Sequence, residues 1–343
     1  MILYEFDYER PASLEQASAH LRRLGDSARL AAGGTDLFPA MRVANERPAT
    51  VVSLGALSPA PPTRQPDGAI RIDALARLAA VADSELIRDA VPMLALAASV
   101  VASCPIRHMA TLGGNLCQDT RCLQLNQKHD YQFKPDCYKR GGAVCYPFPN
   151  NPPGTCWSVH LSDTAPALIA LDARVEIIGG AGSRWASVES LFSGSGMKPL
   201  RLAGDEIVRA IVVPAPAARF GWGFRKSARR GGLEYGASVM SVALTAAEAT
   251  QTCRSARIVI GAIRERPVRA TQAEQMLAGA ALDAETIAQA AAAVAKEISP
   301  LPHHGFTRSY IRDDIRVKIA RVLREAADRA LGAEGQKGEA DRG

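Results

Sequence analysis

The sequence predicts an α+β protein with a larger N-terminal domain and a smaller C-terminal domain. Its 343 residues exceed the usual length of a single domain. Strand and helix patterns are interspersed as far as residue 216, whereas beyond it three extended runs come first and two or three helices follow. We therefore predict one domain over 1–216, a second α+β domain over 217–332, and a flexible polar tail over 333–343.

The elements of the larger domain can be assigned in chain order. Residues 13–24 have helical spacing of apolar positions behind Ser13, a residue type preferred as an N-cap. Residues 28–42 (ARLAAGGTDLFPAMR) predict a short strand, a glycine turn and the start of a helix. The remaining expected elements are strands at 50–54, 69–73 and 206–214, helices at 74–90 and 91–104, and a hairpin at 174–187.

The smaller domain follows a different pattern, in which strands precede helices. The histidine pair His303–His304 lies in a loop, and because adjacent side chains cannot both point one way, we expect this pair at the surface. The expected elements are extended runs at 220–228, 236–247 and 256–263, followed by helices at 271–280, 284–298 and 307–331.

Composition and missing motifs exclude several classes of protein. Hydrophobic residues make up 47% of the chain, and the net charge of +6 is spread without a Lys/Arg run, which argues against a nucleic-acid partner. The N-terminus lacks a signal-peptide pattern, and the longest apolar stretch, 90–106, is too short to span a bilayer. We therefore expect a cytoplasmic protein with no membrane contact. The absence of GxGxxG, Walker and HExxH motifs argues against a nicotinamide-binding Rossmann domain, a P-loop nucleotidase and a zincin.

Five of the seven cysteines fall within one irregular segment. Residues 117–156 are rich in Asn, Gln, Pro, Gly and Tyr, and apolar periodicity stops at Leu116 and resumes only at Asp163. A structureless insertion of this length needs something to order it, and several thiolates on one metal centre would supply that free energy. Cys104 and Cys253 lie in apolar stretches and are expected to be ordinary buried thiols.

The spacing of these cysteines favours an iron–sulfur centre. The gaps after Cys122 are fourteen, seven and ten residues, and no CxxC pair occurs, whereas zinc sites usually contain paired ligands two to four residues apart. Wide, unequal spacing suits a cluster whose irons accept ligands from separate turns. A structural zinc site and free thiols remain alternatives.

Two glycine pairs predict a second kind of site. Ala32-Gly33-Gly34-Thr35-Asp36 lies between a strand and a helix, and Thr111-Leu112-Gly113-Gly114-Asn115 follows an apolar helix. Consecutive N–H groups in tight glycine turns bind anions, and two such loops suit the pyrophosphate of an extended dinucleotide. A purely steric role for the glycines is the alternative.

Five separated motifs together resemble a known family. AAGGTDL, ATLGGNL, SDTAPALIALDA, KSARRGGLEYGASVMSVAL and RPVRATQAE occur in this order and resemble the FAD-binding medium subunits of the molybdenum hydroxylases, over roughly residues 4 to 330. The resemblance implies a two-part FAD-binding domain of the vanillyl-alcohol-oxidase/PCMH type, followed by a smaller α+β C-terminal domain.

The resemblance also implies roles for particular residues. Asp163 would bind the ribityl or adenosine part of the flavin, and Lys226 would reach the flavin from the C-terminal domain. Without the family, Asp163 could cap a helix at 164–171 and Lys226 could be a solvated charge. The two glycine loops would hold the FAD pyrophosphate through Ala32, Gly33, Gly34, Thr35 and Asp36 and through Thr111, Gly113, Gly114 and Asn115.

The cysteine segment resembles a narrower group within the family, the β subunits of 4-hydroxybenzoyl-CoA reductases, which insert about 40 residues at this point. The resemblance implies a 4Fe–4S cluster held by Cys122, Cys137, Cys145 and Cys156, with Cys117 outside it.

No catalytic constellation is evident, so the implied role is electron transfer rather than substrate chemistry. The implied partners are a large molybdenum-cofactor subunit, a small 2Fe–2S subunit in an (αβγ)2 assembly, and ferredoxin. The mild basicity would suit an acidic ferredoxin. The alternatives are an oxidative hydroxylase acting on another aromatic or heterocyclic substrate, and a zinc-stapled binding module.

Overall fold

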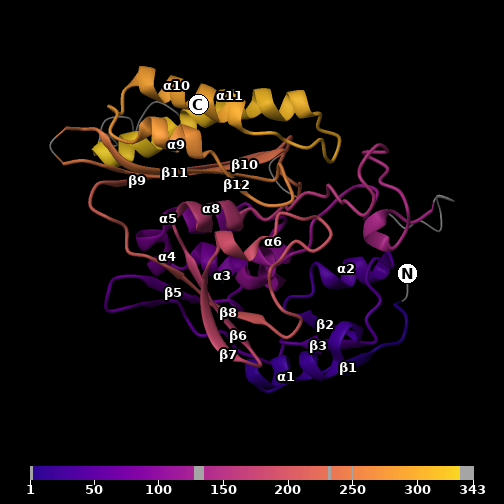
Figure 1. Cartoon of the computed structure of the whole chain (residues 1–343). Coiled ribbons are helices and arrows are strands. Elements are labelled where there is room, and N and C mark those ends of the chain that lie inside the picture. Colours follow the sequence, from indigo (N-terminus) through magenta and orange to yellow (C-terminus); the bar gives the residue numbers. More distant parts are fainter. Residues whose placement is uncertain (1–2, 127–134, 231–232, 249, 333–343) are drawn as a thin grey trace.

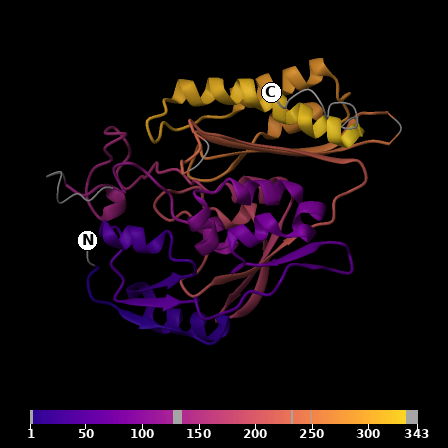
Figure 2. The same cartoon turned by 180° about the vertical axis from the view of Figure 1, so that it is seen from behind.

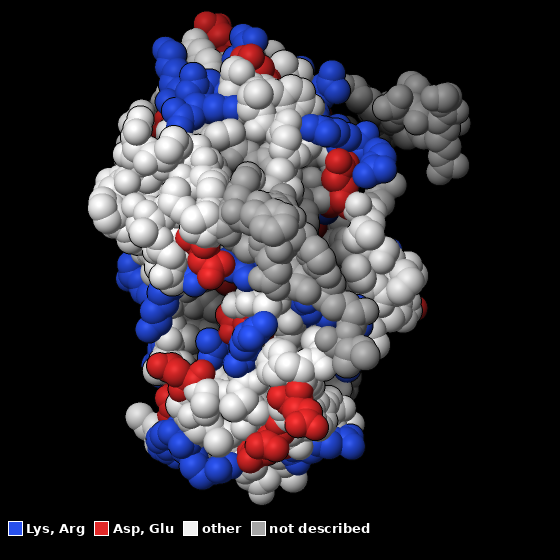
Figure 3. All heavy atoms as spheres, turned by 90° about the vertical axis from the view of Figure 1, so that its right-hand side faces the viewer, with Lys and Arg blue, Asp and Glu red and all other residues white. Residues whose placement is uncertain are grey.

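A computed structural model describes residues 3–126, 135–230, 233–248 and 250–332. The α+β fold class is confirmed: in these ranges, three separate sheets are combined with helices (Figure 1). The predicted tail, 333–343, lies outside the described residues. None of the helices in the described ranges is long and apolar enough to cross a membrane. On the face seen in Figure 3, Lys and Arg side chains alternate with Asp and Glu and form no continuous basic stripe.

The N-terminal residues form a small parallel sheet covered by a helix. Its strands are β1 (Asp7–Glu9), β2 (Ala28–Ala31) and β3 (Thr50–Ser53), in the order β1-β3-β2. The predicted first helix is α1 (Leu14–Leu24), and Ser13 caps it by accepting the N–H of Gln16 at 3.2 Å. The glycine turn after β2 leads into α2 (Leu37–Arg42).

A five-stranded antiparallel sheet makes up the rest of the larger part. Its order is β4-β5-β8-β6-β7, and the predicted hairpin is β6 and β7. The helix predicted at 74–90 is interrupted at Ser84, whose extended backbone ends one helix while its side chain caps the next. The elements are β4 (Thr63–Arg64), β5 (Ile70–Asp73), α3 (Leu78–Asp83), α4 (Glu85–Ala90), α5 (Pro92–Ser99), α6 (Cys104–Met109), α7 (Leu112–Leu116), β6 (Arg174–Gly179), β7 (Gly182–Ser187) and β8 (Ile207–Val213).

The C-terminal part is a four-stranded antiparallel sheet between two helical layers. The last helix buries Ile311, Ile315, Ile319 and Val322, a helical spacing that turns one face onto the sheet. Figures 1 and 2 show α8 (Thr164–Ala170) against the opposite face of that sheet. The elements are β9 (Phe220–Ser227), β10 (Ser238–Ala246), β11 (Cys253–Gly261), β12 (Val268–Arg269), α9 (Thr271–Leu277), α10 (Ala284–Glu297) and α11 (Arg308–Leu331).

A continuous hydrophobic core joins the two parts. Leu168 and Ile169 of α8 belong to the same buried cluster as Val239 of β10 and Val259 of β11. Since α8 comes from the first part and the strands from the second, this packing joins the two parts, and Lys226 Nζ of β9 lies 2.7 Å from Oδ2 of Asp163, directly before α8. The core thus brings residues from both parts of the chain together around the segment that precedes α8.

The cysteine segment is irregular, as predicted. Within its described residues the regular structure is a single 3-10 turn, η3 (Tyr138–Arg140), together with isolated bridges. The side chain of Arg140 donates to Asn45 Oδ1 at 2.8 Å, just beyond α2, and Lys139 pairs with Asp119. The Arg140 contact holds the segment against the end of α2, and the Lys139 pair joins two parts of the segment itself.

Candidate functional site

The first glycine loop, residues 32–36, is packed so closely that only glycine fits at its centre. A Cβ on Gly33 would lie 2.1 Å from the carbonyl oxygen of Met109, and Gly34 has a positive φ of 70°. None of the N–H groups from Gly33 to Asp36 has an acceptor among the described residues. A tight turn with several unpaired N–H groups is suited to an anion.

The second glycine loop, residues 111–115, is arranged differently. Gly113 donates its N–H to the carbonyl of Ala74 at 2.8 Å, Gly114 donates to Thr111 Oγ1 at 3.0 Å, and Asn115 donates to the Thr111 carbonyl at 2.9 Å. The backbone donors of this loop are therefore engaged inside the protein. The sequence predicts the same anion-binding role for both loops, whereas in the structure the unpaired backbone N–H groups lie mainly in the first loop.

The side chain of Asn115 links the second glycine loop to the segment that precedes α8. Its Oδ1 accepts hydrogen bonds from the hydroxyls of Ser162 and Thr164, both at 2.7 Å. Ser162 Oγ also accepts the N–H of Ala165 at 3.0 Å, which is the geometry of a helix cap. The Asn115 side-chain N–H2 group has no partner among the described residues and remains available to a ligand.

Asp163 and Lys226 form a buried ion pair between the two parts of the chain. Lys226 Nζ lies 2.7 Å from Asp163 Oδ2 and 3.1 Å from the carbonyl of Val100. The side chain of Lys226 is 9% exposed and that of Asp163 is 6% exposed. The alternative that Lys226 is a solvated surface charge is therefore wrong. Asp163 makes no capping hydrogen bond, because Ser162 takes that role. Burial raises the pKa of Asp163 to about 6, although the Lys226 ammonium lowers it in part.

Arg121 is one residue of this region that the sequence reasoning missed. Its guanidinium pairs with Asp36 of the first glycine loop and lies 5.2 Å from the ring centre of Tyr235. The backbone N–H of Asp119 donates to the same Asp36 carboxylate at 3.3 Å. Burial raises the pKa of Tyr235, and the charges of Asp36 and Asp163 raise it further while Arg121 lowers it. Only the position of Arg121 directly before Cys122 could have indicated its role.

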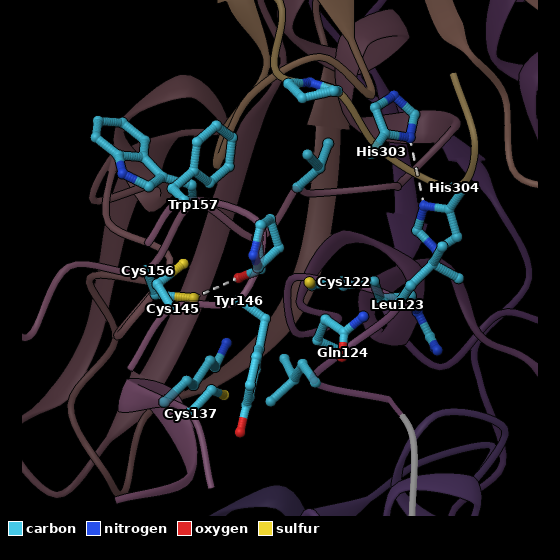
Figure 4. Close-up of a pocket in the computed structure, with 18 of the residues that line it drawn as sticks. Cys122, Leu123, Gln124, Cys137, Cys145, Tyr146, Cys156, Trp157, His303 and His304 are labelled. Carbon is cyan, nitrogen blue, oxygen red and sulfur yellow. Dashed lines mark hydrogen bonds between the residues drawn. The ribbon is translucent and has the colours of Figure 1, made fainter. Parts of the chain in front are cut away.

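Cys122, Cys137, Cys145 and Cys156 line one cavity of about 470 Å³ (Figure 4). They come from separate turns of the irregular segment. The rest of the wall is largely apolar and includes Leu123, Leu125, Val144, Phe148 and Trp157. Arg121 also lines this cavity, so a single residue contacts both the cysteine cavity and the first glycine loop.

The four thiols are close enough to influence one another. Burial raises the pKa of Cys122, and charge on Cys156 and Cys137 raises it further, against hydrogen bonds from the Leu125 and Gln124 backbone. Burial likewise raises the pKa of Cys145, with additional contributions from the other three cysteines. Within the parts of the chain that the structure describes, no three His, Cys, Asp or Glu side chains come together tightly enough to hold a single metal ion.

The other cysteines lie outside the cavity. Burial raises the pKa of Cys117 to about 12. Cys253 is buried, as predicted. The prediction for Cys104 is wrong: it begins α6 at the surface, because the apolar stretch before it turns away at Ala102, which has a positive φ of 43°.

The surface prediction for the histidine pair is also wrong. His303 and His304 line the cysteine cavity, and His303 is only 8% exposed (Figure 4). Their Nδ1 atoms are 3.3 Å apart, and the His304 ring lies 5.1 Å from that of Tyr235. His304 adopts a positive φ of 47°, which turns both rings to one side. Burial lowers the pKa of His303 to about 4.

Comparisons with known proteins agree with this arrangement. Residues 4–216 match the FAD binding domain in molybdopterin dehydrogenase, and residues 222–326 match the CO dehydrogenase flavoprotein C-terminal domain. The caffeine dehydrogenase subunit beta of Pseudomonas sp. (strain CBB1) is 29% identical over 80% of this chain and 78% of its own length. The carbon monoxide dehydrogenase medium chain of Afipia carboxidovorans is 26% identical over 96% of this chain and 98% of its own.

Solved structures share the fold. A Cu,Mo-CO dehydrogenase chain superposes with a TM-score of 0.77 at 23% identity, covering 96% of this chain and 100% of its own. The carbon monoxide dehydrogenase of Hydrogenophaga pseudoflava gives 0.77 at 24% identity, over 96% and 99% of the two chains. The chain therefore belongs to the FAD-binding medium subunits of the molybdenum hydroxylase family and is an oxidoreductase subunit.

Proposed function

We propose that this chain is an electron-transfer subunit that carries both FAD and a 4Fe–4S cluster. It would pass electrons between a ferredoxin and the 2Fe–2S and molybdenum subunits of an (αβγ)2 enzyme, a 4-hydroxybenzoyl-CoA reductase acting by dehydroxylation. The observation that carries the proposal is the convergence of Cys122, Cys137, Cys145 and Cys156 on one cavity, whose wall includes Arg121, the partner of Asp36 in the first glycine loop.

The residues of the glycine loops fit a bound dinucleotide. The unpaired N–H groups of Gly33, Gly34 and Thr35 would receive the pyrophosphate of FAD, with Ala32 and Asp36 completing the loop. In the second loop, the Asn115 amide is the free donor, while Thr111, Gly113 and Gly114 hold the loop in shape. The Asp163–Lys226 pair would place a fixed carboxylate and ammonium beside the flavin.

We propose a four-iron cluster rather than a zinc ion for the cysteine cavity. Four thiolates on one zinc would lie about 3.8 Å apart, as Zn–S bonds of about 2.3 Å require, and the described residues hold no such group. In a four-iron cluster each thiolate binds a different iron, so the sulfurs stand farther apart around a larger space. FAD exchanges one or two electrons and such a cluster one, which matches a subunit without a catalytic constellation of its own.

A second candidate keeps the cofactors but reverses the chemistry of the complex. Relatives of similar identity are subunits of a caffeine dehydrogenase and a nicotine 6-hydroxylase. These names favour an oxidative enzyme acting on an aromatic or heterocyclic substrate. The substrate is bound outside this chain, so turnover of the purified complex with 4-hydroxybenzoyl-CoA and with aromatic heterocycles separates the two candidates.

The cofactor proposal is tested with Cys137→Ser, expressed together with the partner subunits. We expect it to lose about four irons and four sulfides per chain relative to the wild type and to keep its FAD, because the glycine loops lie outside the cysteine segment. The matched control, Cys117→Ser, alters a cysteine that does not line the cavity and should keep all the iron.

Three outcomes would contradict the proposal. Equal iron and sulfide in the wild type and Cys137→Ser would show that the cavity holds no cluster, and one zinc per wild-type chain would favour the binding-module alternative. Loss of FAD from Cys137→Ser would show that the cysteine segment is part of the flavin pocket.

A further inference from the structure

We propose that Lys139, Thr120 and Ser158 form a hydrogen-bond relay that sets the reduction potential of the cluster through the sulfur of Cys156. This inference rests on the proposed cluster. Ser158 Oγ lies 3.0 Å from Cys156 Sγ, Thr120 Oγ1 lies 2.6 Å from Ser158 Oγ, and Lys139 Nζ lies 2.8 Å from Thr120 Oγ1. The relay thus reaches from a charged ammonium group to one cysteine sulfur.

The backbone fixes the two hydroxyls side by side. Arg121 and Val159 form an antiparallel bridge, with N–H to carbonyl distances of 2.8 and 2.9 Å in the two directions. Thr120 and Ser158 each precede one of these bridged residues and are only 1% and 2% exposed. The Lys139 side chain is 10% exposed and also donates to Asp119 Oδ1 at 2.6 Å. The relay is therefore preorganised and shielded from water.

The chemistry of the groups fixes the direction of the hydrogen bonds. An ammonium group only donates, so Thr120 Oγ1 accepts from Lys139. A thiolate only accepts, so Ser158 must donate to Cys156 Sγ once that sulfur is a ligand. Ser158 then accepts the hydroxyl hydrogen of Thr120, which otherwise goes to the carbonyl of Gly196 at 3.2 Å. With Cys156 deprotonated, every donor in the relay points toward the sulfur.

Such a relay stabilises the reduced cluster. Each added electron makes the cluster more negative, and a hydrogen bond to a ligand sulfur, polarised along the relay by the Lys139 ammonium, favours that charge. The same segment also donates to Asp36 of the first glycine loop, through the Asp119 N–H and the Arg121 guanidinium. Lys139 and Ser158 thus line the cysteine cavity, and the residues on either side of Thr120 contact the first glycine loop.

The test is an EPR-monitored redox titration of the intact complex. We expect a more negative midpoint potential for the four-iron signal in each of three variants: Ser158→Ala, Thr120→Val and Lys139→Met. The variant Ser158→Thr keeps the hydroxyl and should have the wild-type potential. The control is Thr155→Val: this residue lines the same cavity, and its side chain makes no hydrogen bond among the described residues.

The outcomes distinguish this inference from the proposed function. A four-iron signal with unchanged midpoint potential in Ser158→Ala and Thr120→Val would contradict the role of the relay but not the presence of the cluster. Absence of that signal from the wild type would overturn both. If Ser158→Ala fails to assemble the cluster, Thr120→Val decides, because it leaves the hydroxyl on Ser158 and removes only the link to Lys139.

Discussion

Replacing Lys226 with methionine should destabilise the chain strongly and in a pH-dependent way. Even beside Lys226, burial raises the pKa of Asp163 from 3.8 to about 6, which corresponds to about 3 kcal/mol of lost stability at neutral pH. Removing the cation that pairs with Asp163 in the described part of the chain adds a further loss of about 3–5 kcal/mol. Lys226→Met should therefore be several kcal/mol less stable than the wild type at pH 7.5.

The sign of the pH effect follows from the direction of the pKa. The pKa of Asp163 is higher in the folded than in the unfolded state. The folded protein therefore loses stability as the pH rises above 3.8, the ordinary pKa of this carboxyl group. Without Lys226 the folded pKa rises above about 6, so the loss extends to higher pH. Below pH 4.5 Asp163 is protonated in both proteins, and the deficit should shrink to about 1 kcal/mol or less.

The assay is urea unfolding of the flavin-free full chain, followed by tryptophan fluorescence at pH 4.5, 6 and 7.5. Arg316→Met is the matched control, because the Arg316–Asp313 pair is 3.9 Å apart with side chains 63% and 68% exposed. An exposed pair of this kind contributes less than about 1 kcal/mol. A Lys226→Met protein as stable as the wild type at pH 7.5, or with the same deficit at every pH, would refute the reasoning.

Three further predictions concern the flavin loops and the thiols. Gly33→Ala should lose FAD, because its Cβ would lie 2.1 Å from the Met109 oxygen, whereas Gly204→Ala, with nothing within 4 Å, should keep it; equal flavin absorbance in the two would count against the loop. Arg121→Met should weaken FAD binding by roughly 10-fold or more, because a hydrogen bond to a charged group contributes about 1.5–3 kcal/mol; a flavin titration with unchanged affinity would contradict this. In the native full chain, the exposed Cys104 should react quickly with a maleimide, whereas Cys253 should not, because burial raises its pKa to about 11. Mass mapping of the labelled peptides measures this, with Cys104→Ser as the control that should lose the fast label.

Much of the fold could be predicted because local signals and packing agree. The position of α1 follows from its cap and helical spacing and those of α10 and α11 from helical spacing alone, and the buried faces of all three are the apolar ones. The division of the helix predicted at 74–90 could not be read from apolar spacing, because Ser84 both ends one helix and caps the next. Periodicity reports which residues are buried and not where the backbone bends.

The site was only partly predictable. The cysteines and glycine loops stand out by composition and order, but the inequality of the two loops depends on the carbonyl of Ala74, which is distant in sequence. Arg121 and Ser158 carry no motif, and Tyr235 lies in one that assigned it no role, so their importance comes from partners brought together by the fold. The positive φ of His304, which turns the histidine pair into the cavity, is likewise set by tertiary packing.

Anomalous X-ray diffraction from crystals of the purified complex, collected on both sides of the iron and zinc absorption edges, would locate any metal in this subunit directly. We expect iron density in the cavity walled by Cys122, Cys137, Cys145 and Cys156, resolved as four atoms with one thiolate on each. Density at the zinc edge alone, or no anomalous density between those sulfurs, would contradict the electron-transfer role proposed for this chain.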